Sequence, residues 1–120
     1  MRQGYSWSFP AESRTAVTVG AVSAPVIPLV DLRHREVWVV EAINDDLAQT
    51  IDLKLEHSFD GVAPWYVVDE DSLSVLGPGE IRSISKDTRG YQYGRVTAKS
   101  RGAGGVAARV SSATVYRRAQ

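Results

Sequence analysis

The chain consists of short runs in which apolar and polar residues alternate, and turn-forming residues separate one run from the next. Alternation with period two is typical of a β-strand that buries one of its two faces. The stretch 51–56 shows it most clearly, because Ile51, Leu53 and Leu55 alternate with two acids and a lysine. No window of about 11 residues or more carries the period of a helix. The chain is therefore expected to be all-β.

The number of these runs predicts the architecture. Eight or nine short strands with turn signals between them indicate a single antiparallel β-sandwich of about eight strands, jelly-roll-like in form. Glu36–Ile43 is the best candidate for a central strand, because it is rich in β-branched and aromatic residues. The apolar residues change register near Ile84 and around Gly94, so bulges are expected there. The candidate strands are 15–23, 26–27, 36–43, 50–57, 65–68, 72–76, 80–85, 91–98 and 106–116.

Size and composition fit one folded domain. With 120 residues, 43% of them hydrophobic, the chain can bury one core. It has no cysteine, which excludes a disulfide framework, a zinc site built on thiolates and a cysteine nucleophile. No stretch approaches the roughly 18 apolar residues of a membrane span, so no membrane partner is expected. The first residues contain no apolar run, so we expect no signal peptide. The protein is expected to be made and folded in a cytoplasm.

The N-terminal residues 1–14 are expected to form an extended arm in front of a sandwich domain at 15–120. Tyr5, Trp7 and Phe9 alternate with two serines, and a proline then ends the run. Three aromatic side chains on one face of a short terminal segment need a surface to pack against. That surface is either the core of the same domain or a neighbouring molecule.

The net charge is zero, but the charges are unevenly distributed along the chain. Residues 1–40 carry a net charge of +1, residues 41–80 carry −9, and residues 81–120 carry +8. The preferred interpretation is that antiparallel strands from the last two thirds interleave and neutralise each other. Attraction between copies of the protein is a second interpretation. Nucleic acid is a third, and it is disfavoured because few aromatic residues stand among the basic ones.

Candidate catalytic and metal-binding residues each have a simpler interpretation. Asp60 and Asp69–Asp71 could offer oxygen ligands to a hard cation, but no calcium-loop motif is present and a solvated hairpin corner explains them equally well. His57 continues the inward face of its strand, and His34 lies in a charged connection. The loop Gly102–Gly105 lacks the phosphate-binding pattern, and no nucleophile elbow occurs. No enzyme activity, metal or cofactor is expected.

The stretch SFDGVAPW, residues 58–65, has a structural interpretation first. Asp60-Gly61 is a strong turn dipeptide, because glycine tolerates a positive φ and aspartate can bond to the backbone nearby. Pro64 stiffens the exit, and Trp65 is expected to place a large apolar surface on the sheet.

The same stretch carries a resemblance to a known group of proteins. The pattern S-x-D-G-x-x-x-W, followed by a strand, a glycine/proline turn and the run YQYGRVTA at 91–98, resembles small β-sandwich proteins of tailed-bacteriophage structural modules. The resemblance covers about residues 36–116 and does not include the arm. One extra residue before Trp65 lengthens the usual corner.

The resemblance implies a non-catalytic component of the virion, made in the host cytoplasm: a capsid decoration protein, or a head-fibre, neck or tail component. Such a protein would bind a capsid or tail lattice as a symmetric homo-oligomer, a trimer being one form, and its partners would be itself and other virion proteins. The arm residues Tyr5, Trp7 and Phe9 would then be the partner interface. The alternative is a glycan-binding sandwich for host recognition, in which Trp38, Trp65, Tyr91 and Tyr93 are the candidates for stacking on sugar rings.

Overall fold

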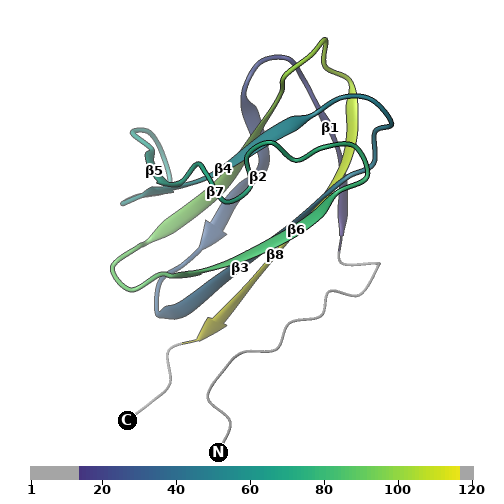
Figure 1. Cartoon of the computed structure of the whole chain (residues 1–120). Coiled ribbons are helices and arrows are strands. Elements are labelled where there is room, and N and C mark those ends of the chain that lie inside the picture. Colours follow the sequence, from purple (N-terminus) through teal and green to yellow (C-terminus); the bar gives the residue numbers. More distant parts are fainter. Residues whose placement is uncertain (1–13, 117–120) are drawn as a thin grey trace, which may run out of the picture.

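The computed structural model describes residues 14–116, which form eight antiparallel strands and the loops between them (Figure 1). The predicted all-β architecture is confirmed, and no helix occurs between residues 14 and 116. The strands are β1 (Thr15–Val19), β2 (Ala24–Asp31), β3 (Arg35–Asn44), β4 (Ile51–Ser58), β5 (Tyr66–Asp69), β6 (Ile81–Asp87), β7 (Tyr93–Ser100) and β8 (Val106–Tyr116).

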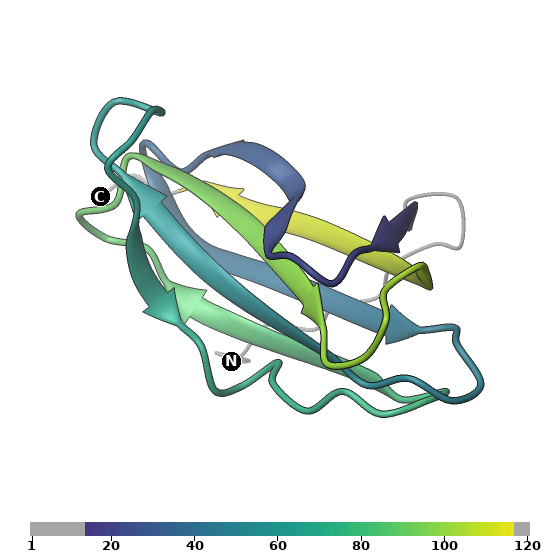
Figure 2. The same cartoon turned by 90° about the horizontal axis from the view of Figure 1, so that it is seen from above.

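The strands form two four-stranded sheets with the orders β1-β8-β3-β6 and β2-β7-β4-β5. Their pairing is nested: the first strand pairs with the eighth, the second with the seventh, the third with the sixth and the fourth with the fifth. Nested pairing of eight strands in two facing sheets is the arrangement of a jelly roll. Figure 2 shows the two sheets lying face to face.

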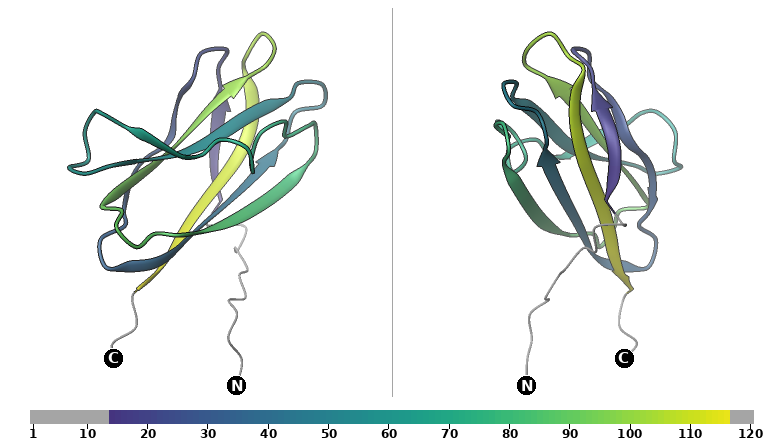
Figure 3. Two further views of the ribbon diagram at one scale, coloured as in Figure 1. Left: turned by 60° about the vertical axis from the view of Figure 1, so that its left-hand side comes forward. Right: turned by 90° about the vertical axis from the view of Figure 1, so that its right-hand side faces the viewer.

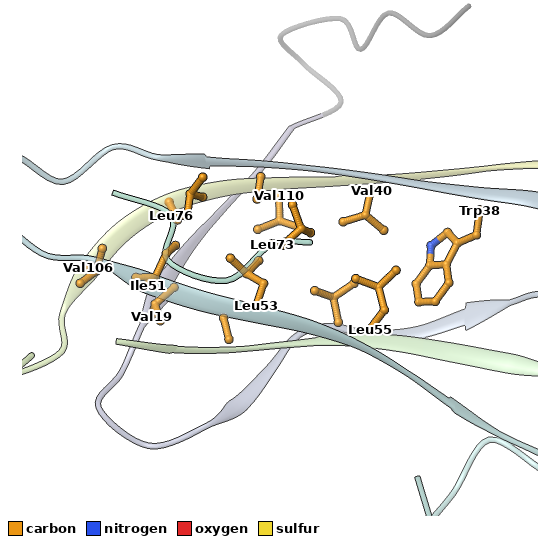
Figure 4. Close-up of a cluster of buried hydrophobic side chains, with 14 of the residues drawn as sticks. Val19, Trp38, Val40, Ile51, Leu53, Leu55, Leu73, Leu76, Val106 and Val110 are labelled. Carbon is orange, nitrogen blue, oxygen red and sulfur yellow. The ribbon is translucent and has the colours of Figure 1, made fainter. Parts of the chain in front are cut away.

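The hydrophobic core lies between the sheets and is built from every second residue of the central strands (Figure 4). In β4, Ile51, Leu53 and Leu55 are at most 1% exposed, as their alternation predicts. In β3, Trp38 and Val40 point inward. Burying one large apolar side chain of this kind stabilises a fold by about 1.5–3 kcal/mol. The rest of the core is Val19, Leu32, Ala42, Leu73, Leu76, Val96, Ala98, Val106, Ala108 and Val110.

Gly94 of β7 lies directly against the Trp38 ring of the opposite sheet. A methyl group at Gly94 would come within 2.8 Å of Trp38 Cη2 and 2.9 Å of Leu32 Cδ1, which is too close for a side chain. The bulge predicted at Gly94 is wrong, because β7 pairs with β4 in unbroken register. The glycine is required for space instead. The register shifts lie in β2, whose sequence contains two prolines.

The bulge predicted near Ile84 is also wrong. Strand β6 pairs with β3 without a register shift from Ile81 to Asp87. Ile84 packs against the core, and Ile81 lies on the other face and is exposed. The error came from the assumption that both isoleucines point inward.

Residues 72–76 form a loop rather than the predicted strand. Leu73 and Leu76 are buried in the core, and Val75 is exposed with a φ of 52°. Leu76 exchanges two backbone hydrogen bonds with Ile51, at 2.9 and 3.0 Å. Arg82 of β6 donates a hydrogen bond to the carbonyl of Ser74 at 2.6 Å. These contacts hold the loop without a regular strand ladder.

The acidic middle third and the basic last third of the chain neutralise each other within the domain, as the preferred interpretation of the charges predicts. Four ion pairs join an acid of the middle third to a distant base of the last third. They are Asp45–Arg109 (2.8 Å), Asp52–Arg101 (2.7 Å), Glu56–Arg95 (2.8 Å) and Asp69–Lys86 (2.8 Å).

Gly94→Ala is expected to lower the free energy of unfolding by about 1–3 kcal/mol, because the methyl group overpacks the core against Trp38. Urea unfolding followed by tryptophan fluorescence measures the change. Gly20→Ala is the matched control, because its methyl group would meet no atom closer than 3.9 Å, and it should change stability by less than about 0.5 kcal/mol. Equal stability of the two variants would show that the Trp38 ring can move aside.

Candidate functional site

The corner at residues 58–65 is a turn whose polar side chains bond to its own backbone. The hydroxyl of Ser58 accepts a hydrogen bond from the N–H of Gly61 at 3.1 Å. Asp60 Oδ1 accepts one from the N–H of Val62 at 3.2 Å. Gly61 has a φ of 85°, which favours glycine. The turn predicted for Asp60-Gly61 is therefore confirmed, and the Asp60 carboxylate is used to form it.

Four apolar side chains are exposed around this corner. They are Leu29 of β2, Phe59 and Val62 of the turn, and Tyr66 of β5, and we refer to them as the apolar corner. Phe59 is 65% exposed. The Phe59 and Tyr66 rings lie with centroids 6.0 Å apart, and a methyl group at Gly61 would lie 3.6 Å from Leu29 Cδ1. The loop projects from one end of the sandwich (Figure 3).

The apolar corner was not anticipated as a surface from the sequence. Phe59 and Val62 stand in a turn segment, where large apolar side chains have no sheet face to bury them. That mismatch between turn chemistry and apolar side chains is the signal that could have indicated it.

His57 lies beneath the apolar corner and contacts three aromatic rings. The distances between ring centroids are 4.5 Å to Tyr91, 5.3 Å to Phe59 and 5.6 Å to Tyr66. Half-buried at the end of β4, it occupies the inward rim position that the strand alternation predicts. Its Nδ1 is buried without a hydrogen-bond partner among residues 14–116. The ring therefore acts mainly as a packing surface for the corner.

The four aromatic residues considered for sugar stacking divide into two groups. Trp38 is fully buried and donates a hydrogen bond to Ser112 Oγ at 2.8 Å, and Tyr91 packs against the core. Trp65 and Tyr93 are half-buried, and each lies beneath a guanidinium group. Only these two remain as candidate contacts for a ligand.

Arg95, on the outward face of β2-β7-β4-β5, contacts both the Trp65 ring and an acidic partner. Its guanidinium carbon lies 4.4 Å from the centroid of the Trp65 ring, and its Nε donates to Glu56 Oε1 at 2.8 Å. A cation over an indole ring is attracted by the ring's π-electrons. Trp65 packs on the sheet as predicted, but on the outward face.

A groove of about 530 Å³ lies on the same sheet face, near the start of β4. Asp52 accepts two hydrogen bonds from Arg101, at 2.7 and 3.0 Å, and these bonds hold the pKa of Asp52 below its ordinary value. Thr97 is 4% exposed, and its hydroxyl has no hydrogen-bond partner among the described residues. The other charged residues that line the groove are Lys54, Glu70, Asp71 and Lys99.

Asp69 joins the edges of the two sheets. Its carboxylate accepts hydrogen bonds from Lys86 Nζ at 2.8 Å, from the N–H groups of Asp71 and Ser72 at 3.0 and 2.8 Å, and from the Ser72 hydroxyl at 2.7 Å. Burial alone would raise the pKa of Asp69, but these donors outweigh it and hold the pKa well below its ordinary value.

The candidate metal residues are not gathered into one site. Asp69 is occupied by protein donors, and Asp60 by its own turn. Within residues 14–116, no group of three or more histidine and carboxylate side chains is placed to hold a metal ion. His34 is exposed in the β2–β3 turn with a φ of 62°. Gly102–Gly105 forms the β7–β8 hairpin loop.

The predicted partner interface of Tyr5, Trp7 and Phe9 lies outside the described residues, so its placement stays a prediction.

No family model matches the chain, and a search of curated proteins found no match to it. In the described part of the chain there is no helix of the length and hydropathy that crossing a membrane requires.

Asp69→Asn is expected to destabilise the protein by about 1–3 kcal/mol at neutral pH, because an amide neither pairs with Lys86 nor accepts the same set of hydrogen bonds. The folded-state pKa of Asp69 lies below the ordinary 3.8, so on acidification the unfolded chain takes up the proton first and the stabilisation is lost below about pH 4. The gap between wild type and variant should therefore shrink as the pH falls from about 6 to 3.

Urea midpoints measured across that pH range test the expectation. Glu70→Gln is the matched control, because Glu70 is the exposed neighbour of Asp69, and its effect should stay below about 0.5 kcal/mol. A gap that is constant with pH would show that Asp69 does not stabilise the fold through its charge.

Proposed function

We propose that the protein is a non-catalytic structural component of a phage virion, made in the host cytoplasm, that binds a capsid or tail lattice as a symmetric oligomer. The apolar corner is the observation that carries this proposal. Exposed apolar side chains that lie together and project from a domain mark a site of protein–protein contact. Aromatic side chains such as Phe59 and Tyr66 dominate the binding energy of such contacts.

The location of the corner suits a lattice contact. The loop projects beyond the end of the sandwich, so it can reach a neighbouring subunit without a clash between the two domain bodies (Figure 3). His57 and Tyr91 support it from below, so the exposed rings rest on side chains that are themselves packed. A contact surface that is already organised loses less conformational entropy on binding.

The charges give less support to an electrostatic contact. The acidic and basic thirds of the chain are already paired inside the domain, as in Asp45–Arg109 and Asp52–Arg101. Association through the apolar corner should therefore depend little on salt, because screening acts on exposed charges and not on apolar burial.

Native mass by light scattering tests the self-association part of the proposal. The wild type is expected to form an oligomer at micromolar concentration, at low and at high salt alike. Phe59→Ser should weaken association at least about tenfold, because burial of a phenylalanine is worth about 1.5–3 kcal/mol. Leu47→Ser is the control, since Leu47 is 96% exposed and stands outside the corner.

A wild type that is monomeric at every concentration would remove self-association from the proposal. An oligomer that Phe59→Ser leaves intact would place its interface elsewhere. An oligomer that dissociates in high salt would favour contact between charges of neighbouring copies.

The second candidate function is glycan binding, and the groove on the outward face of β2-β7-β4-β5 favours it. Lys54 and Lys99 offer donors, Glu70 and Asp71 offer acceptors, and the groove as a whole is close to neutral. Hydroxyl groups of a sugar can donate to one set and accept from the other.

A glycan array followed by titration of tryptophan fluorescence tests this candidate. If a glycan binds, Lys99→Ala is expected to weaken binding about tenfold, the loss of one charged hydrogen bond, without changing the thermal midpoint. Leu47→Ser should bind as the wild type does. An array without a hit, or binding that Lys99→Ala does not change, would contradict glycan binding in this groove.

A further inference from the structure

Two valines of β3 are buried on the face of the sheet that points away from the core. Trp38 and Val40 point inward, so Val37 and Val39 between them point outward. Neither outward valine belongs to the core between the sheets. Val39 is nevertheless only 3% exposed. Something on the outward face of β1-β8-β3-β6 must cover it.

The two residues directly opposite Val39 are too small to provide that cover by themselves. Across the ladder it faces Ser85 of β6 on one side and Ala113 of β8 on the other. Ile43, further along the same strand, differs because it faces Arg109 and Ile81, whose longer side chains can shield it.

On this outward face, side chains of β8 are more buried than those of β6. Ser83 and Ser85 of β6 are exposed, whereas Ser111 of β8 is 2% exposed. All three point outward by their register with β3. The cover therefore lies over β8 and β3, on the side of the sheet where β1 begins, and leaves β6 open.

The side chain of the residue that precedes β1 lies over this face. Arg14, the residue before β1, donates from its Nε to Glu41 Oε1 of β3 at 2.6 Å. The register places Glu41 opposite Ser111, and Thr15 opposite Val110, so the Arg14 side chain reaches across β8 to β3. Glu41 is two positions from Val39 on the same outward face.

We propose that the aromatic arm of the same chain covers this surface, with Tyr5, Trp7 and Phe9 packed on the outward face of β8 and β3 over Val37 and Val39. An extended chain covers about 3.3 Å per residue, so the seven steps along the chain from Arg14 to Trp7 span up to about 23 Å. Val39 lies about 7 Å along the strand from Glu41 by the same measure. The arm is therefore long enough to reach the valines.

The alternation of the arm fits the surface. Aromatic side chains at every second position all point to one side of an extended segment, and the serines between them point to the other. The apolar side can bury the two valines while the serines face solvent. This proposal does not depend on the lattice proposal, and it assigns the arm to its own domain rather than to a partner.

Chemical unfolding of Trp7→Ala in the full chain tests the proposal. The variant is expected to raise the unfolding equilibrium constant at least about tenfold, by the same factor at protein concentrations that differ a hundredfold, because an arm bound to its own domain gains nothing from concentration. Ser8→Ala is the matched control and should be silent. Trp7→Leu is measured in case Trp7→Ala does not fold, and it should have a smaller effect in the same direction.

A double-mutant cycle locates the contact. The effects of Trp7→Ala and Val39→Ala should be less than additive, because each removes the same packing. The control pair is Trp7→Ala with Ile81→Ala, which lies on the open side of the same face and should be additive.

Three results would overturn the proposal. The first is a silent Trp7→Ala with an additive cycle. The second is that the difference in stability between Trp7→Ala and the wild type disappears when both proteins are diluted. That result would mean that the arm of a second copy covers the surface. The third is that Trp7→Ala has no effect, whereas removal of residues 117–120 exposes Val39 to a surface-labelling probe. That result would mean that the C-terminal residues cover Val39.

Discussion

The contact between Trp38 and the bare backbone of Gly94 holds the two sheets together at one end of the sandwich. Trp38 belongs to β3 and Gly94 to β7, so the indole fills the space between the sheets and needs a position without a side chain opposite it. Its N–H would be costly to bury alone, and Ser112 of β8 accepts the hydrogen bond. The contact with Gly94 thus sets the spacing of the sheets at this point, and the hydrogen bond to Ser112 satisfies the indole N–H.

Around that core, charged residues form ion pairs that join neighbouring strands. Glu56–Arg95 joins β4 to β7, and Asp69–Lys86 joins the edge of one sheet to the edge of the other. Surface ion pairs contribute little individually, but Asp69 is mostly shielded and is bound by four donors, so its charge is part of the fold. The uneven charge along the sequence therefore reflects which strands are neighbours, and gives little guide to a partner.

Much of the fold could be predicted from the sequence, because period-two alternation is a local property of each strand. The all-β class, the inward face of β4 and the turn at Asp60-Gly61 follow from residues that are adjacent in sequence. The errors arose where distant residues decide the structure. Gly94 looked like a bulge because the Trp38 ring opposite it cannot be read from β7 alone, and 72–76 looked like a strand because Leu73 and Leu76 are buried by a loop. The apolar corner was missed for the same reason, since exposure depends on what the rest of the fold leaves uncovered.

The nested order of the strands has a consequence for how the chain acquires its structure during synthesis. Strand β1 pairs only with β8 among the described strands, so the first of these eight strands to be synthesised waits for the last of them. The β4–β5 pair can form early, but the sheet β1-β8-β3-β6 has no centre until β8 exists, because β8 lies between β1 and β3. Pairing between such distant segments is slow and leaves strand edges open in the meantime. The domain therefore completes its fold only after β8 has been translated, and until then the edge of β3 that pairs with β8 in the folded domain has no partner.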